Sequence, residues 1–314
     1  MSSDFAALAL AVAGLLLVLT LIAQALRARV PPGRRVPGVE AFAARVRGWW
    51  AMAVLLALAL LLGRAGVVLL FAFASFAALR EVATYTAKAR EDHATLALAF
   101  FAVLPLQFLF VGMGWPGLFT IFIPVYVFLG LSVLSALRGS PARFLARVAE
   151  TQWALVTCVY GASHVPALMT LSLPGSNEGA LLIAFLILAV QGGEVADGLA
   201  GRRWRSRPIA PALSPRNWHG AAGGVSAAAV IGALLSWLTP FGVLGSALMA
   251  AVAAAAGLAG TLVLAAIKRE RGVRDWSHLI PGQGGILDQL GGVFFAAPLF
   301  YHLTHFGWAV GGPQ

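Results

Sequence analysis

Residues 268 to 288 read KRERGVRDWSHLIPGQGGILD, a charged and glycine-containing segment between two long apolar stretches. About 20 consecutive apolar residues cross a bilayer as a helix, so this segment is expected at a membrane surface between two transmembrane helices. Its basic residues suit phosphate groups, and the carboxylates of Asp275 and Asp288 suit a divalent metal ion. Its Pro-Gly-Gln-Gly-Gly turn lets the backbone approach a ligand closely. The segment predicts a helical membrane protein and, as a first hypothesis, metal-assisted chemistry on a phosphorylated substrate.

The composition is that of a membrane protein. Of the 314 residues, 60% are hydrophobic and 11% are charged, and the mean hydropathy is +0.86, whereas soluble domains are about 25% charged. The single cysteine, Cys158, excludes an intrachain disulfide and a multi-cysteine metal site. The net charge of +10 indicates membrane orientation rather than binding to nucleic acid, because basic residues collect in cytoplasmic loops.

The apolar stretches predict ten transmembrane helices in one membrane domain. Their approximate ranges are 5–26, 49–62, 65–79, 96–113, 116–137, 152–172, 179–194, 219–238, 242–267 and 289–310. Alternating these helices from an outside N-terminus places every Lys and Arg except Arg64 in loops on one side. We therefore expect an all-α integral membrane bundle of about ten helices, N-out and C-out, with the basic side facing the cytoplasm. Within it, residues 1–175 are expected to form a lipid-facing scaffold and residues 176–314 the catalytic half.

Three other segments have local interpretations. The first apolar run follows Asp4 without a basic region before it, which favours a retained helix over a signal peptide. The segment VEAFAARVRGWW at 39–50 is typical of an amphipathic interfacial stretch, with Trp49 and Trp50 as belt residues. The small-residue run at 245–260 permits close helix approach, either within the chain or between subunits.

A second polar cluster is VQGGEVADGLAGRR at 190–203. Glu194 and Asp197 lie three positions apart and so share a helix face at the cytoplasmic end of a span. Ionisable groups at that depth are costly and usually functional. Glu194 is the better candidate for a metal ligand, whereas pairing with a neighbouring arginine (Arg202, Arg203 or Arg205) is an equally good explanation of Asp197.

A third cluster, SPRNWHGAAGG at 214–224, combines a Ser-Pro turn and the cation Arg216 with the start of a helix, where free backbone N–H groups attract phosphate. The chain contains no GxxxxGK[ST] phosphate loop, no HExxH zinc motif and no GxSxG elbow. His164, His302 and His305 are interpreted as packing residues within spans. His278, inside the charged loop, is the histidine to test for catalysis.

In this order and spacing, the three clusters resemble the phosphatidate cytidylyltransferase (CDP-diacylglycerol synthase) family, whose C-terminal signature has the form S-x-x-K-R-x4-K-D…H-G-G-x-x-D-R-x-D. The segments KRERGVRD, LIPGQGG and ILDQL fall on that pattern. Gly193-Glu194, Gly201 and the SPRNWHGAAGG turn correspond to upstream features of the family. The resemblance covers about 190 to 310, and the N-terminal half is similar in layout through its WW pair at 49, REVATY at 80 and PVY at 124.

The resemblance implies a reaction in which a phosphatidate oxygen attacks the α-phosphate of CTP, giving CDP-diacylglycerol and pyrophosphate. It implies Asp275, Asp288 and Lys268 as catalytic residues, and Mg²⁺ held by Asp275, Asp288 and Glu194, with a monovalent cation as a second candidate. It also implies a homodimer in the bacterial inner membrane, with the site facing the cytoplasm. The substrate-binding residues that it implies are Arg269, Ser214, Arg216, Gly282, Gly284, Gly285 and His278.

Differences from the family pattern leave two other functions open. This chain has Gln283 for the motif histidine, Gln289 for the arginine, Gly291 for the last aspartate and Gly193-Glu194 for an Asn-Asp pair. A catalytically degraded homologue would act as a membrane lipid-binding or assembly protein. An ion-coupled transporter could use Glu194 and Asp197, although the gathering of charge at one interface speaks against a transmembrane route.

Overall fold

The computed structural model describes residues 3–30, 36–85, 93–138, 141, 143–173, 179–280 and 283–308, and within these ranges it contains helices and no strand. The N-terminal elements are α1 (Ser3–Ala28), α2 (Pro37–Leu61), α3 (Gly63–Tyr85), α4 (His93–Leu98), η2 (Ala99–Val103), α5 (Leu104–Met113), α6 (Pro116–Ile121), η3 (Phe122–Val127), α7 (Phe128–Arg138), α8 (Phe144–Leu155), η4 (Val156–Gly161), α9 (Ala162–Ala167) and η5 (Leu168–Thr170). The C-terminal elements are α10 (Gly179–Arg203), α11 (Trp218–Leu234), η6 (Ser236–Leu238), α12 (Gly242–Arg271) and α13 (Ile286–Trp308).

The predicted fold class, a polytopic helical membrane protein, is confirmed. Eight helices in the described ranges are long and apolar enough to cross a membrane. The shorter apolar helix α11 and the continuous helical run from α8 to η5 account for the two other predicted spans. Each predicted span therefore coincides with a helical segment, because the length of an apolar run is a direct measure of its capacity to cross the bilayer.

The helices extend beyond their apolar stretches. α2 includes the whole amphipathic stretch at 39–50, which is therefore the first half of a continuous span. Within α2, the indole N–H of Trp50 donates to Thr20 of α1 at 3.0 Å, so this ring joins two helices. α3 ends at Tyr85 and α10 at Arg203, so acidic residues close to their ends lie inside helices.

Three π-helical segments, η2, η3 and η4, interrupt spans of the N-terminal half. Proline lies close to η2 and within η3, at Pro105 and Pro124. Proline has no N–H and clashes with the carbonyl four residues earlier, so a widened turn accommodates it. Beside η3, Gln107 donates to the backbone oxygen of Phe119 and to Ser163, both at 2.9 Å. This buried amide satisfies backbone polarity where the bilayer offers no water.

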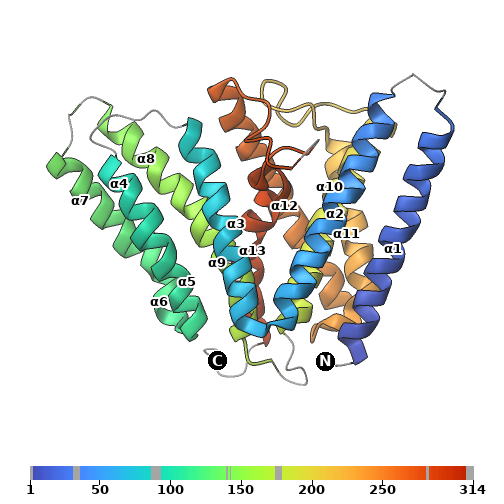
Figure 1. Cartoon of the computed structure of the whole chain (residues 1–314), viewed down its shortest axis with the longest axis horizontal. Helices are drawn as coiled ribbons and strands as arrows, with labels where there is room; N and C mark the ends of the chain where they lie inside the picture. The colour runs from blue at the N-terminus through green and yellow to red at the C-terminus, as the bar shows by residue number, and fades with distance from the viewer. Residues whose placement is uncertain are drawn as a thin grey trace.

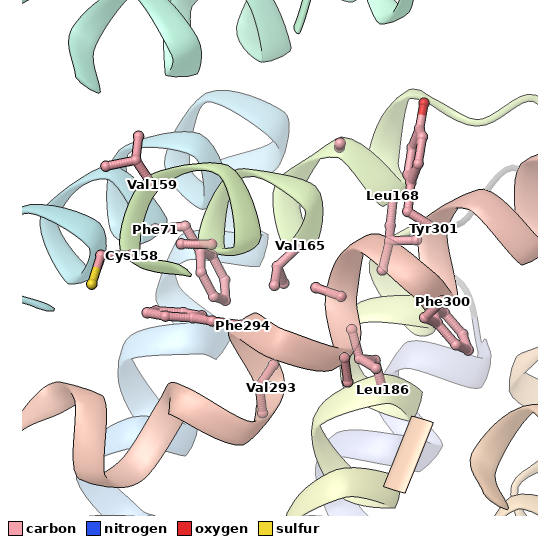
Figure 2. Close-up of a cluster of buried hydrophobic side chains, with 14 of the residues drawn as sticks. Phe71, Cys158, Val159, Val165, Leu168, Leu186, Val293, Phe294, Phe300 and Tyr301 are labelled. Atoms are coloured by element: carbon pink, nitrogen blue, oxygen red, sulfur yellow. The ribbon is translucent and has the colours of Figure 1, made fainter. Parts of the chain in front are cut away.

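One hydrophobic core joins the two halves of the chain. Val293, Phe294 and Phe300 of α13 lie among residues of α3, η4, α9 and α10, including Phe71 and Leu186 (Figure 2). The small-residue run at 245–260 packs inside the molecule, where a Cβ on Gly257 would lie 3.3 Å from the backbone oxygen of Gly292. Of the two interpretations of this run, the contacts support intramolecular packing.

Polar segments distant in sequence meet at one side of the bundle. The connections from α10 to α11 and from α12 to α13 both lie at the upper side in Figure 1, where α3 ends and α2 begins. The three polar clusters therefore share one membrane surface.

We predict that Gln107→Leu lowers the free energy of unfolding by about 1 kcal/mol, a typical value for an interhelical hydrogen bond in a membrane. Reversible denaturation in mixed micelles measures the change. Thr120→Val is the matched control, because among the described residues the Thr120 hydroxyl bonds only within its own turn, to the backbone oxygen of Pro116. Equal losses in the two variants would contradict the role assigned to Gln107.

Candidate functional site

Asp288, in the first turn of α13, connects three parts of the C-terminal half. Its Oδ1 accepts from Lys268 Nζ at 2.8 Å, and its Oδ2 accepts from the backbone N–H groups of Trp276 and Gly285 at 2.8 and 2.9 Å. The side chain of Asp288 is 8% exposed and that of Lys268 is 23% exposed. Lys268 lies in the last turn of α12 and Asp288 in the first turn of α13, positions at which each charge complements the helix dipole.

The glycines of the signature turn are required by neighbouring carboxylates. Gly284 has φ +85, and a Cβ there would lie 2.4 Å from Asp288 Oδ2. A Cβ on Gly285 would lie 2.3 Å from Glu81 Oε1. The sequence predicted a close backbone approach at this turn, and its partners are acidic side chains of the same chain. Gly282, another predicted binding residue, lies outside the described residues.

Glu81 of α3, which is not among the site residues predicted from the sequence, belongs to this site. Its side chain is buried, and its Oε1 accepts from Ser277 Oγ at 2.7 Å and from Ile286 N at 2.9 Å. Its Oε2 accepts from Leu287 N at 2.9 Å. From the sequence, Glu81 in REVATY lies just after the predicted span 65–79, whereas in the structure α3 continues to Tyr85 and places this acid inside a helix. An acidic residue within a membrane helix is a functional hypothesis by default.

The second and third polar clusters meet through Arg216. Its Nε lies 3.1 Å from Asp197 Oδ2, and its Nη1 donates to Thr261 of α12. Asp197 is therefore paired with an arginine, but with one from the next cluster rather than from its own helix end. Ser214 is buried, and its hydroxyl accepts from the Arg216 backbone N–H at 3.3 Å.

The start of α11 is closed by its own cap. Asn217 Oδ1 accepts from Gly220 N at 2.7 Å, and Asn217 Nδ2 donates to the backbone oxygen of Gly201 in α10 at 2.9 Å. An asparagine at this position satisfies one of the backbone N–H groups that were predicted from the sequence to attract phosphate. The cluster thus presents Arg216 and leaves less of the helix start available to an anion.

Glu194 has a polar atom without a partner. Its Oε1 is buried and forms no hydrogen bond within the described part of the chain. A Cβ on Gly292 of α13 would lie 2.1 Å from this oxygen, so the carboxylate occupies the space that this glycine leaves. Arg216 and Arg45, from α2, are within electrostatic range of Glu194. Arg216 and Arg45 therefore attract, and Asp197 repels, a carboxylate of which one oxygen has no donor among the described residues.

Three predicted site residues have free side chains. Arg269 and His278 are exposed and Asp275 is half-buried. Over the described ranges, none of the three has a side-chain hydrogen bond or ion pair. They are available to a ligand, whereas Lys268, Asp288 and Arg216 already have partners in the protein.

The predicted magnesium ligands are not gathered into one cluster. Among the described residues, no group of three or more His, Cys, Asp or Glu side chains is placed to hold a metal ion. Asp288 is occupied by three donors, but the unpartnered oxygen of Glu194 and the free carboxylate of Asp275 have suitable ligand chemistry. Mg²⁺ usually takes one or two carboxylates and completes its shell with water and phosphates, so a single one of these carboxylates is sufficient for a metal ion that arrives with a phosphorylated substrate.

Three glutamines form a chain of hydrogen bonds across the site. Gln191 of α10 donates to the Gln289 backbone oxygen at 2.6 Å, and Gln289 Nε2 donates to the Gln283 backbone oxygen at 2.8 Å. Gln283 Nε2 in turn donates to the Ala44 backbone oxygen of α2 at 2.9 Å. Gln283 and Gln289 thus place neutral amides where the family pattern has a histidine and an arginine.

Where the family pattern has its last aspartate, this chain has Gly291, and an apolar side chain fills the space beside it. A Cβ on Gly291 would lie 2.3 Å from Leu264 Cδ1 of α12, so an aspartate would require Leu264 to move. Compared with the family pattern, this chain has one carboxylate fewer at this site, and Leu264 occupies the space in which that carboxylate would lie.

Sequence comparisons agree with the resemblance. The pattern of the cytidylyltransferase family matches residues 43–306. A protein of Escherichia coli (strain K12), YnbB, described as uncharacterized, is 32% identical over 297 residues, which cover 93% of this chain and 95% of the relative. The phosphatidate cytidylyltransferase of Brucella suis is 36% identical over 138 residues, or 42% of this chain and 51% of the relative. That of Haemophilus influenzae is 29% identical over 136 residues, 41% of this chain and 47% of the relative, so the chain matches about half the length of these two.

We predict that a double-mutant cycle of Lys268→Ala and Asp288→Ala gives a coupling energy of about 1 to 3 kcal/mol in unfolding experiments, because the pair is mostly shielded from solvent. The same cycle on Arg27 and Glu40, an ion pair that is 40% and 52% exposed, should give less than about 1 kcal/mol. Comparable values for the two pairs would contradict the bridging role of Asp288.

Proposed function

The chain belongs to the cytidylyltransferase family, and from that premise we propose that it transfers the cytidylyl group of CTP to phosphatidate. The products would be CDP-diacylglycerol and pyrophosphate, in phospholipid biosynthesis. The observation that carries the proposal is that the three polar clusters meet at one end of the bundle (Figure 1). There Lys268 pairs with Asp288 and Arg216 pairs with Asp197. Glu194 has one oxygen without a partner among the described residues.

In the proposed reaction, a phosphate oxygen of phosphatidate forms a bond to the α-phosphorus of CTP. The bond from that phosphorus to the oxygen of the β-phosphate breaks, and pyrophosphate leaves with the electron pair. No covalent intermediate with the protein is needed, so the protein contributes positioning and neutralisation of charge. Lys268, Arg269 and Arg216 would contact phosphate oxygens.

The proposed reaction also uses a magnesium ion. Bound Mg²⁺ would neutralise charge on the triphosphate and on the leaving pyrophosphate. Glu194 and Asp275 are the residues of this chain that would hold it, whereas Asp288 would keep Lys268 and the signature turn in place. A monovalent cation that accompanies the Mg²⁺ is part of the same proposal.

We further propose that the site faces the cytoplasm from a bacterial inner membrane. The basic loops lie on one side in the predicted topology, which the positive-inside rule assigns to the cytoplasm, where CTP is found. Phosphatidate would enter laterally between helices with its acyl chains in the bilayer. The N-out, C-out orientation and a homodimer belong to this proposal.

A catalytically degraded homologue is the second candidate, and it would act as a membrane lipid-binding or assembly protein. Two observations favour it. Leu264 fills the space beside Gly291, where the family pattern has an aspartate, and the glutamine chain through Gln283 and Gln289 is neutral.

We predict that the purified protein in lipid nanodiscs converts radiolabelled CTP and phosphatidate into CDP-diacylglycerol. Lys268→Ala should lower kcat by about 10²-fold or more, the usual effect of removing a group that stabilises developing charge. Arg203→Ala is the matched control, because Arg203 is an exposed cation on the same side and should leave the rate unchanged. If the wild-type protein forms no CDP-lipid from any of several acidic lipids, the degraded homologue becomes the better proposal.

We also predict that chelation with EDTA abolishes the activity and that added Mg²⁺ restores it. Glu194→Gln and Asp275→Asn should each raise the half-saturating Mg²⁺ concentration by about tenfold or more, as expected for the loss of a metal-side carboxylate. Glu40→Gln, which removes an exposed carboxylate outside the site, should not. Unchanged Mg²⁺ dependence in both site variants would show that other groups hold the metal ion.

A further inference from the structure

The N-terminal half contributes a buried acid to the signature segment. Glu81 is 2% exposed, and it lies 205 residues before Ile286, whose backbone N–H it binds. A carboxylate inside a membrane-spanning helix is costly unless hydrogen bonds stabilise it. Here one hydroxyl and two backbone N–H groups donate to its two oxygens.

Carboxylates accept from three successive N–H groups at the start of α13. The first N–H groups of a helix have no partners within it and carry the positive end of the helix dipole. The N–H of Gly285 donates to Asp288, and the next two, from Ile286 and Leu287, donate to Glu81. These three amides are therefore closed to a phosphate group, and their role is to hold the turn in one shape.

α3 contacts the same segment at a second point. Tyr85 lies one turn after Glu81, and its ring centroid is 6.1 Å from that of the buried Trp276. The backbone N–H of Trp276 donates to Asp288. α3 thus contacts two parts of the chain that bind Asp288, namely the turn at 285–287 and Trp276. Asp288 in turn binds Lys268.

We propose that Glu81 is a positioning residue for the cytidylyl transfer. It does not touch the substrate. It holds the backbone of residues 285–287 and through it the carboxylate of Asp288, which directs Lys268 toward the phosphates. This inference rests on the proposed function, and it makes α3, expected from the sequence to be scaffold, part of the site.

The test replaces Glu81 by glutamine in the full-length protein in nanodiscs and measures hydrogen–deuterium exchange together with kinetics. We expect amide exchange to increase in peptides covering 276–288 and to stay unchanged in α10 and α11. We expect kcat to fall by about tenfold or more with less than about a threefold change in KM for CTP, because loss of orientation acts on the transition state. Glu81→Asp, which keeps the charge, should recover part of the rate.

Glu150→Gln is the matched control. Glu150 of α8 is a partly buried carboxylate that pairs with Arg271 at the end of α12, and its ion pairs do not involve residues 276–288. It should leave both exchange in 276–288 and kcat near the wild-type values. An equal loss of kcat in this variant would overturn the specific role of Glu81.

A second variant keeps the test decisive if Glu81→Gln does not fold. Ser277→Ala removes one of the three donors and should produce smaller changes in the same direction, with kcat reduced by about threefold. Unchanged exchange and kcat in Ser277→Ala would then overturn the proposal.

The outcomes separate this inference from the proposed function. An active wild type with unchanged exchange or unchanged kcat in Glu81→Gln overturns the positioning role and leaves the function intact. An inactive wild type overturns the function. In that case exchange alone decides whether Glu81 orders the segment: faster exchange confined to 276–288 supports it, and unchanged exchange overturns it.

Discussion

The free amides at the start of α13 impose the constraint on which this side of the molecule depends. They lie at the edge of the apolar region, where an unpaired N–H is costly. Asp288 and Glu81 together accept from three successive backbone N–H groups. Because Asp288 also binds Lys268 of α12, and Glu81 comes from α3, the same bonds join both halves of the chain around the signature segment.

This arrangement changes the interpretation of the segment at 268–288. Its glycines make room for acidic side chains of the chain itself, and Asp288 has three donors before any ligand arrives. Among the described residues, the predicted site side chains without a partner are Arg269, Asp275 and His278, together with one oxygen of Glu194. The site thus divides into residues that hold the turn and residues that can bind a ligand.

The structure agrees best with the prediction from sequence where local composition decides whether a segment is helical. All ten apolar runs correspond to helical segments, but several helices extend further, because amphipathic ends such as 39–50 continue the span. The three polar clusters could be identified from the sequence. For Asp197, pairing with an arginine of its own helix end was one of two equal explanations, and its partner in the structure is Arg216. From the sequence Glu81 falls in the scaffold, since nothing local shows that an acid in REVATY meets a turn some 200 residues later.

The sequence by itself determined that this chain is a helical membrane protein with its polar clusters on one side, because bilayer thickness and charge sorting act on short stretches of sequence. Its place in the cytidylyltransferase family followed from the resemblance of its short motifs to the family pattern. Only the tertiary structure decided from which donor each carboxylate accepts a hydrogen bond. A buried acid takes whichever partners the packing of helices brings within about 3 Å, and the partners of Glu81 and Asp197 lie on other helices or loops. That packing is set by the shared core of α3, α10 and α13, which no single segment contains.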